Sequence, residues 1–98
     1  MKTVMVRYQV RPEAAAENER LVKEVFAQLA REKPAGLRYQ TLKLADGVSF
    51  VHIASRESAD ASPLLQLAAF KQFLGGIKER CVVQPETIEV DVVGAYSG

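Results

Sequence analysis

The 98-residue chain has one cysteine, one histidine and no tryptophan. A single cysteine, Cys81, excludes a disulfide within the chain. One cysteine and one histidine, His52, are too few ligands for a zinc site of the usual Cys/His kind. We therefore expect no bound metal ion, and no cofactor.

The chain also lacks a long apolar run and an excess of charge of either sign. Charges at Arg7 and Arg11 interrupt the N-terminal segment, so no signal-peptide core or membrane span is expected. Thirteen Lys and Arg against twelve Asp and Glu give a net charge of +1, with no basic block to follow a phosphate backbone. These absences argue against nucleic-acid and membrane partners and predict a cytoplasmic protein. No repeat or linker divides the chain, so residues 1–98 are expected to form one domain.

The hydrophobic residues, 48% of the chain, follow two periods. Strict alternation predicts strands, and recurrence every three to four residues predicts helices. Pro12 suits a first helical turn, Ser62 and Pro63 form a second helix start, and Pro34 and Pro85 are expected to end the helical regions. The predicted elements are strand 3–10, helix 12–33, strands 37–44 and 48–55, a helical region 63–81 and strand 86–95. Gly75 and Gly76 within that region indicate either a close packing contact or a break between two short helices.

The order strand, helix, strand, strand, helix, strand is the βαββαβ plan of the ferredoxin-like α+β class. It predicts a four-stranded antiparallel sheet with two helices on one face. Right-handed crossovers give the strand order 4-1-3-2.

The register of the central hairpin decides which side chains face the helices, because a slip of one residue exchanges the two faces. The Asp46-Gly47 pair marks the turn. We favour a three-residue loop, which places Gln40 opposite His52 and separates apolar from polar side chains best. A two-residue loop would instead place Thr41 opposite His52.

The favoured register assigns a role to each face of the sheet. His52 and Phe50 would face the helices, together with Tyr8, Arg38 and Gln40. The other face would carry an apolar centre inside a charged rim, the composition of a protein interface. We therefore expect a homodimer formed through the sheet face by Met5, Tyr39, Val51 and Ile53.

Four segments of the chain resemble a known family: "VMVRYQVRPE", "PAGLRYQTLKL", "VSFVHIASRES" and "LAAFKQFLGGI". Over nearly its whole length the chain is similar to the antibiotic biosynthesis monooxygenase-like (ABM-like) domains of the dimeric α/β-barrel superfamily. The resemblance implies a dimeric α/β barrel in which a pocket between sheet and helices holds an aromatic molecule. The Glu, Trp and His common in that family are replaced here by Ala54, Arg56 and Ala69.

Two functions are compatible with this pattern. In the first, the protein is a cofactor-independent monooxygenase-like enzyme for a small hydrophobic or aromatic molecule, with His52 as its catalytic base. In the second, it is a non-catalytic dimeric module for ligand binding or interaction, and His52 is a buried structural imidazole. The candidate ligand-binding residues are Tyr8, Asn18, Arg38, Gln40, Phe50, Phe70 and Phe73. A ligand-sized cavity beside His52 is the observation that the first function requires.

Overall fold

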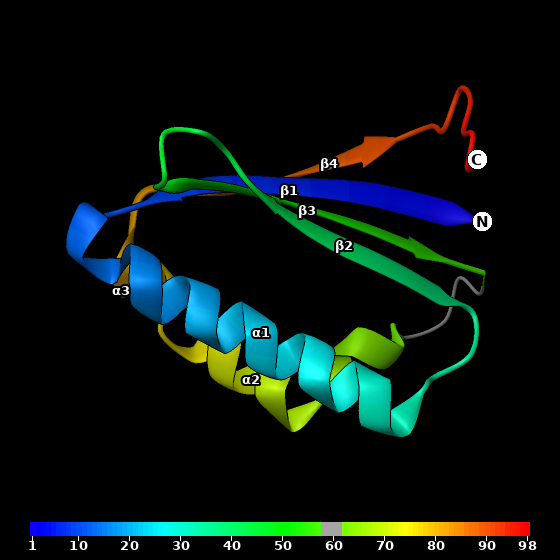
Figure 1. Cartoon of the computed structure of the whole chain (residues 1–98), viewed down its shortest axis with the longest axis horizontal. Coiled ribbons are helices and arrows are strands. Elements are labelled where there is room, and N and C mark those ends of the chain that lie inside the picture. The colour runs from blue at the N-terminus through cyan, green and yellow to red at the C-terminus, as the bar shows by residue number, and fades with distance from the viewer. Residues whose placement is uncertain (58–61) are drawn as a thin grey trace.

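The computed structural model describes residues 1–57 and 62–98 (Figure 1). Its elements run in the predicted order, with the second helical region divided into shorter helices. They are β1 (Lys2–Val10), η1 (Pro12–Ala14), α1 (Ala15–Glu32), β2 (Leu37–Lys43), β3 (Ser49–Arg56), η2 (Pro63–Gln66), α2 (Ala68–Gly75), α3 (Ile77–Arg80) and β4 (Cys81–Val90). No helix in the described part of the chain is long and apolar enough to cross a membrane.

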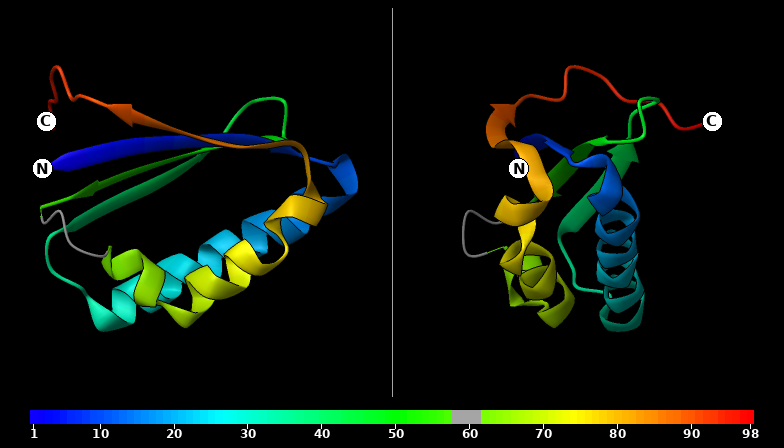
Figure 2. Two further views of the ribbon diagram at one scale, coloured as in Figure 1. Left: turned by 180° about the vertical axis from the view of Figure 1, so that it is seen from behind. Right: turned by 90° about the vertical axis from the view of Figure 1, so that its left-hand side faces the viewer.

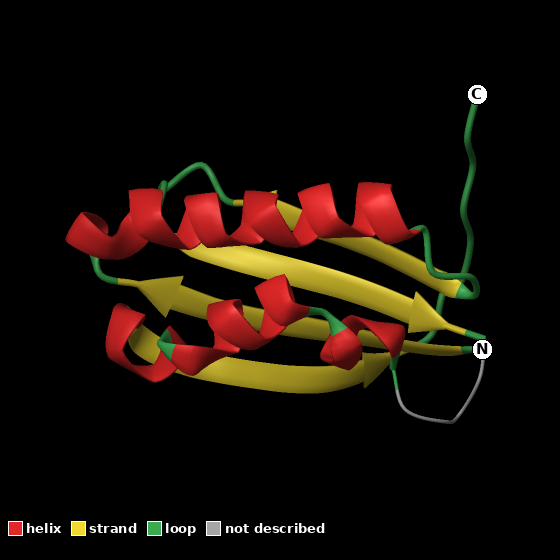
Figure 3. Ribbon diagram, turned by 90° about the horizontal axis from the view of Figure 1, so that it is seen from below, coloured by secondary structure: helices red, strands yellow, loops and turns green. Residues whose placement is uncertain are grey.

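The sheet confirms the predicted α+β, ferredoxin-like fold. Its strand order is β2-β3-β1-β4, and each neighbouring pair is antiparallel. The helices lie on one side of the sheet in both views of Figure 2, and the other side carries no described helix. Seen from the helical side, α1 and the shorter helices cross the sheet next to one another (Figure 3).

Helix α1 forms because its apolar positions recur on one stripe. Leu21, Val22 and Val25 on that stripe are buried against the sheet. The helix stops at Glu32, where Lys33 takes a left-handed conformation (φ 47°) and donates its backbone N–H to Leu29 O at 2.8 Å. The predicted helix 12–33 is confirmed, with its first turn a separate 3₁₀ segment.

The second helical region begins where Ser62 and Pro63 predict. The Ser62 hydroxyl accepts the Leu64 N–H at 3.2 Å, as an N-cap does. Gly75 and Gly76 separate α2 from α3, and an added Cβ on Gly75 would meet nothing within 4 Å. An added Cβ on Gly76, by contrast, would lie 3.0 Å from Arg80 Nη1. The glycine pair therefore marks a break between short helices, with a close contact to Arg80 at Gly76.

Strand β4 departs from the prediction at both ends. It begins at Cys81 and ends at Val90, whereas a strand over 86–95 was predicted. Pro85 lies inside it and does not end the helical region. A proline is tolerated there because β4 is an edge strand, and its pairing with β1 shifts register between Arg7 and Gln9.

The hairpin register is the second correction. Strand β2 pairs with β3 so that Thr41 lies opposite His52, Gln40 opposite Ile53 and Tyr39 opposite Ala54. This is the register of the two-residue alternative, and the favoured three-residue register is wrong. The Asp46 carboxylate accepts the N–H groups of Val48 and Ser49 at 2.9 and 2.8 Å, and Gly47 has φ 78°. These contacts within the turn stabilise the observed register. The pattern of apolar side chains along the strands does not reveal them.

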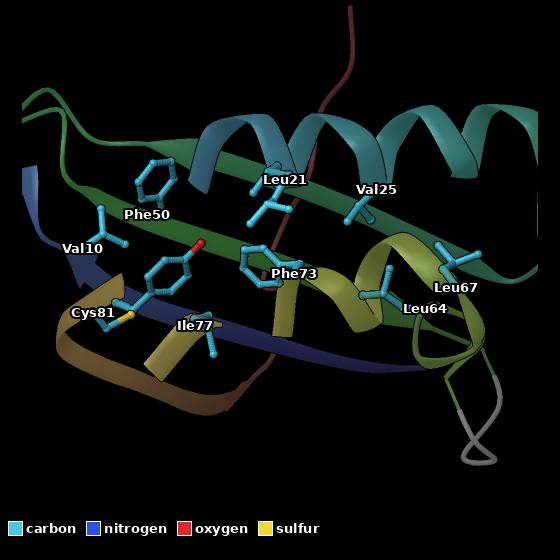
Figure 4. Close-up of a cluster of buried hydrophobic side chains, with 11 residues drawn as sticks. Val10, Leu21, Val25, Phe50, Leu64, Leu67, Phe73, Ile77 and Cys81 are labelled. Carbon is cyan, nitrogen blue, oxygen red and sulfur yellow. The ribbon is translucent and has the colours of Figure 1, made fainter. Parts of the chain in front are cut away.

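The corrected register moves several side chains to the other face. Tyr39 faces the helices instead of the outer surface, while Arg38 and Gln40 point away from His52. On β4, Ile88 pairs with Met5 and therefore lies on the outer face. The buried core itself lies between the sheet and the helices, with Phe50 on the sheet and Phe73 on the helical layer (Figure 4). Both rings pack against Tyr8, at centroid distances of 5.6 and 6.2 Å.

Candidate functional site

A cavity of about 290 Å³ lies between the inner face of the sheet and the short helices. Most of its lining is aliphatic or aromatic, and its buried polar groups come from β1, β2 and β3. The lining residues are Val4, Val6, Tyr8, Tyr39, His52, Ala54, Ser62, Leu64, Leu65, Phe70, Phe73, Leu74, Ile77, Pro85 and Thr87. We call this space the sheet–helix cavity.

His52 lies on the wall of the cavity and is only 5% exposed. Its alternation with Val51 and Ile53 on β3 places it on the inner face. Tyr8 Oη lies 2.7 Å from Nε2, and Tyr39 Oη is hydrogen-bonded to Nδ1. Thr41 Oγ1 is 3.2 Å from the same Nδ1. The imidazole is thus held between two tyrosine hydroxyls. Of the residues expected on its face, Tyr8 bonds to it and Gln40 lies on the other side of the sheet.

A second pair of polar residues lies behind Tyr8. Asn18, at 0% exposure on α1, donates Nδ2–H to Tyr8 Oη at 2.9 Å. Arg80, at the end of α3, donates Nε–H to Asn18 Oδ1 at 3.1 Å and Nη2–H to the Phe73 carbonyl at 2.7 Å. Its guanidinium also lies over the Phe73 ring, 5.2 Å from the centroid. Four elements, β1, α1, α3 and β3, thereby contribute to one buried hydrogen-bond chain.

The direction of each hydrogen bond follows from Arg80, because a guanidinium can only donate. Asn18 must face it with Oδ1, so the Asn18 amide N–H is directed at Tyr8. Tyr8 Oη then already accepts a hydrogen bond, and the one acceptor in reach of its own hydrogen within residues 1–57 and 62–98 is His52 Nε2. We therefore assign the neutral tautomer of His52 with its proton on Nδ1.

Burial sets the protonation states of this chain. It lowers the pKa of His52 from 6.5 to about 4, so the imidazole is neutral at pH 7. Burial raises the pKa of Tyr39 to about 12, against a smaller opposing effect of the Thr41 hydroxyl. Burial also raises the pKa of Tyr8, although the Asn18 hydrogen bond and the Arg80 charge both favour its anion. Both tyrosines therefore remain protonated donors near neutrality.

Aromatic rings surround the imidazole and keep water away from it. The Phe73 centroid is 5.3 Å from that of His52, and Phe70 stacks on Phe73 at 5.9 Å. On the far side of Tyr39, Phe26 stacks at 5.1 Å. An uncharged ligand entering the cavity would contact aromatic rings together with aliphatic side chains.

The structure brings together only part of the predicted site. Tyr8, His52, Phe70 and Phe73 line the sheet–helix cavity. Asn18 and Phe50 are buried beside Tyr8 and do not line the cavity. Asn18 is hydrogen-bonded to Tyr8, and the Phe50 ring stacks on the Tyr8 ring at 5.6 Å.

The predicted place of Arg38 and Gln40 beside His52 is wrong, because the observed register puts both on the outer face of the sheet. Sequence reasoning missed Tyr39 and Arg80. Arg80 follows Phe73 and Ile77 at helical spacing, and this placement of a charge on an apolar stripe was the available signal. Within the described residues, no three His, Cys, Asp or Glu side chains are grouped to hold a metal ion.

Comparison with known proteins identifies the fold. No family model matches the chain, and no curated protein matches its sequence. Solved structures do match. A crystal structure of an antibiotic biosynthesis monooxygenase gives a TM-score of 0.74 at 19% identity, covering 96% of this chain and all of that one.

Two further structures show the same likeness. A variant of SnoaB, a cofactor-independent oxygenase from Streptomyces nogalater, gives a TM-score of 0.69 at 24% identity, over 96% of this chain and 94% of that one. A protein from Nitrosomonas europaea, assigned as an antibiotic biosynthesis monooxygenase, gives a TM-score of 0.75 at 17% identity, over 94% of this chain and 89% of that one. The chain therefore has the ABM-like fold predicted from the sequence, at identities that show the fold alone.

Proposed function

We propose that the protein is a cofactor-independent, monooxygenase-like enzyme acting on a small hydrophobic or aromatic molecule held in the sheet–helix cavity. The observation that carries this proposal is the cavity itself: an apolar space with a neutral imidazole and two tyrosine hydroxyls on its wall. Apolar pockets with a few convergent polar groups and perturbed pKa values are the usual form of small-molecule sites.

The size of the cavity limits the substrate. A cavity of about 150 Å³ lined by apolar side chains holds benzene. The sheet–helix cavity, at about 290 Å³, has room for a molecule of one or two fused rings. Among residues 1–57 and 62–98, no Lys, Arg, Asp or Glu side chain lines it. The ligand is therefore expected to be uncharged apart from one polar edge, as a phenol or quinol is.

The chemistry requires a base and a dry site. For an activated CH₂ group the overall balance is R₂CH₂ + O₂ → R₂C=O + H₂O, and the substrate supplies all four electrons. The first step removes a proton from carbon and leaves a carbanion that can react with O₂. Tyr8 Oη takes this proton while it passes its own to His52 Nε2.

Oxygen uptake with isotope analysis tests the proposal. The protein, treated with chelator, would be incubated with phenols and quinols of one or two rings under ¹⁸O₂. We expect a product that carries one labelled oxygen atom, formed by wild type and not by His52→Gln. Arg31→Ala, on the exposed side of α1, is the matched control and should retain the wild-type rate. Equal rates for wild type, His52→Gln and buffer would refute an enzymatic role.

One observation favours the alternative of a non-catalytic ligand-binding module. Both nitrogens of His52 already have hydrogen-bond partners, as a structural imidazole requires. The same experiment distinguishes the two functions. A compound that binds wild type tightly and is never oxidised would identify a binding protein, and His52→Gln would then leave its affinity close to the wild-type value.

We also propose a homodimer formed by the outer face of the sheet, with the interface residues that the observed register places there. Met5, Val51 and Ile53 remain at its centre, while Tyr39 is replaced by residues that the register places outside. Leu42, 44% exposed, pairs with Val51, and Ile88 pairs with Met5. Packing two such faces would remove this apolar surface from water.

Ile53→Lys tests the dimer. The lysine ammonium would be placed without a partner in a desolvated apolar patch, so we expect the variant to sediment as a monomer or to aggregate. Ala27→Lys, on the exposed side of α1, adds the same charge away from the sheet and should leave the dimer intact. If wild type sediments as a stable monomer at micromolar concentration, the interface is wrong.

A further inference from the structure

His52, Tyr8 and Tyr39 do not use all of their polar hydrogens in the contacts with one another. Two tyrosines and one neutral imidazole carry three polar hydrogens, but they make only two contacts with each other, Tyr8–His52 and Tyr39–His52. One hydroxyl hydrogen is therefore not used between them. Which tyrosine keeps it depends on the direction in which the chain is polarised.

That direction is set by Arg80, which lies at the end of the chain opposite Tyr39 and can only donate. Its N–H groups fix the Asn18 amide, which fixes the Tyr8 hydroxyl as donor to Nε2. The opposite direction would leave the Tyr8 hydrogen without an acceptor at a residue only 3% exposed, at a cost of about 1 to 3 kcal/mol. Nδ1–H accordingly points at Tyr39 Oη, and the unused hydrogen belongs to Tyr39.

Tyr39 lies where a ligand can use this hydrogen, since its side chain lines the sheet–helix cavity. Thr41 Oγ1, which is 3.2 Å from Nδ1 and hydrogen-bonded to Tyr39, is the acceptor within the protein that a ligand oxygen would displace. Thr41 does not line the cavity. A ligand oxygen that reaches Tyr39 would also bind a strengthened donor, because a hydroxyl that accepts a hydrogen bond donates more strongly.

We propose that Tyr39 donates a hydrogen bond to a carbonyl or phenolate oxygen of the ligand, and that the chain Arg80–Asn18–Tyr8–His52 orients it for this role. The cavity therefore selects apolar ring compounds with an oxygen acceptor over equally shaped hydrocarbons. This inference deepens the proposed function by naming the substrate class. In the reaction, proton uptake by His52 through Tyr8 would strengthen the hydrogen bond that Nδ1–H donates to Tyr39 Oη and make Tyr39 a better donor to the developing oxyanion.

The test compares two ligands that differ in one group, 1-tetralone and its hydrocarbon counterpart tetralin. We expect wild type to bind the ketone about tenfold more tightly, the effect of one hydrogen bond. Tyr39→Phe should bind both equally, with tetralin affinity unchanged. Phe26→Leu, beside Tyr39 and outside the cavity lining, is the matched control and should keep the preference.

A measurement on wild type alone covers the case in which Tyr39→Phe does not fold. The infrared C=O stretch of bound 1-tetralone should lie at lower frequency than that of the ketone in hexane. A persistent preference in Tyr39→Phe, equal affinities in wild type, or an unshifted C=O stretch would overturn the assignment and leave the enzymatic proposal standing. If wild type binds neither compound, the cavity takes no such ligand and both proposals fail.

Discussion

Acidification from pH 6.5 to pH 4 should remove about 3 kcal/mol from the free energy of unfolding through His52 alone. The pKa of His52 is about 4 in the folded protein and 6.5 for an exposed imidazole, because burial disfavours the imidazolium. The unfolded chain therefore binds a proton in this range that the folded chain does not. The contribution is fully present above pH 6.5 and is lost progressively as pH falls to about 4.

Urea unfolding of wild type and His52→Gln over this pH range measures the effect. Glutamine can still donate to one tyrosine and accept from the other, but it does not titrate. Glu19 and Asp46, whose pKa values are lowered by hydrogen bonds, also lose stabilisation in acid, and both variants share this loss. The difference between the two profiles isolates the imidazole. Parallel profiles would show that His52 is accessible to water in solution.

Asn18→Leu should destabilise the fold by about 3 kcal/mol. The substitution conserves approximate shape but removes the acceptor of Arg80 Nε–H and the donor to Tyr8 Oη. Arg80 is 9% exposed, so its charge cannot recover the lost bond from bulk water. Thermal and urea unfolding provide the measurement, with Arg31→Ala on the exposed side of α1 as a control expected to change stability by less than about 0.5 kcal/mol.

The double variant Asn18→Leu/Arg80→Met tests the reason for this loss. With both partners apolar, part of the stability should return, because a buried cation without an acceptor costs more than no cation. Additive effects of the two substitutions would mean that Asn18 and Arg80 contribute independently.

The architecture could be predicted because it follows from the period of the apolar residues and from the residues that begin and end helices. Alternation in residues 3–10, the apolar stripe of α1 and the Ser62-Pro63 start each depend on local physics, and the structure confirms them. Strand order followed from the handedness of the crossovers. Pro85 misled because a proline ends a helix and is also tolerated in an edge strand, and only the sheet shows which applies.

The residues of the site depend on the register of the central hairpin, which the sequence leaves open. Hairpin register exchanges the two faces of β2, so it decided whether Arg38 and Gln40 or Tyr39 and Thr41 would approach His52. Apolar segregation favoured the wrong answer, because Lys43 lies on the helical face of β2 and reaches Glu19 at 2.7 Å. A lysine can do this by extending its stem to the surface, so its position carries little information about burial.

The imidazole ¹⁵N spectrum of His52 tests the central claim most directly, because the chain has a single histidine and the spectrum contains one ring. At pH 7 we expect a neutral ring with its proton on Nδ1, no titration until pH approaches 4, and a shift of the Nδ1 resonance when 1-tetralone fills the cavity. A ring that titrates near pH 6.5, carries its proton on Nε2, and does not respond to the ketone would contradict both the buried chain and the ligand site built on it.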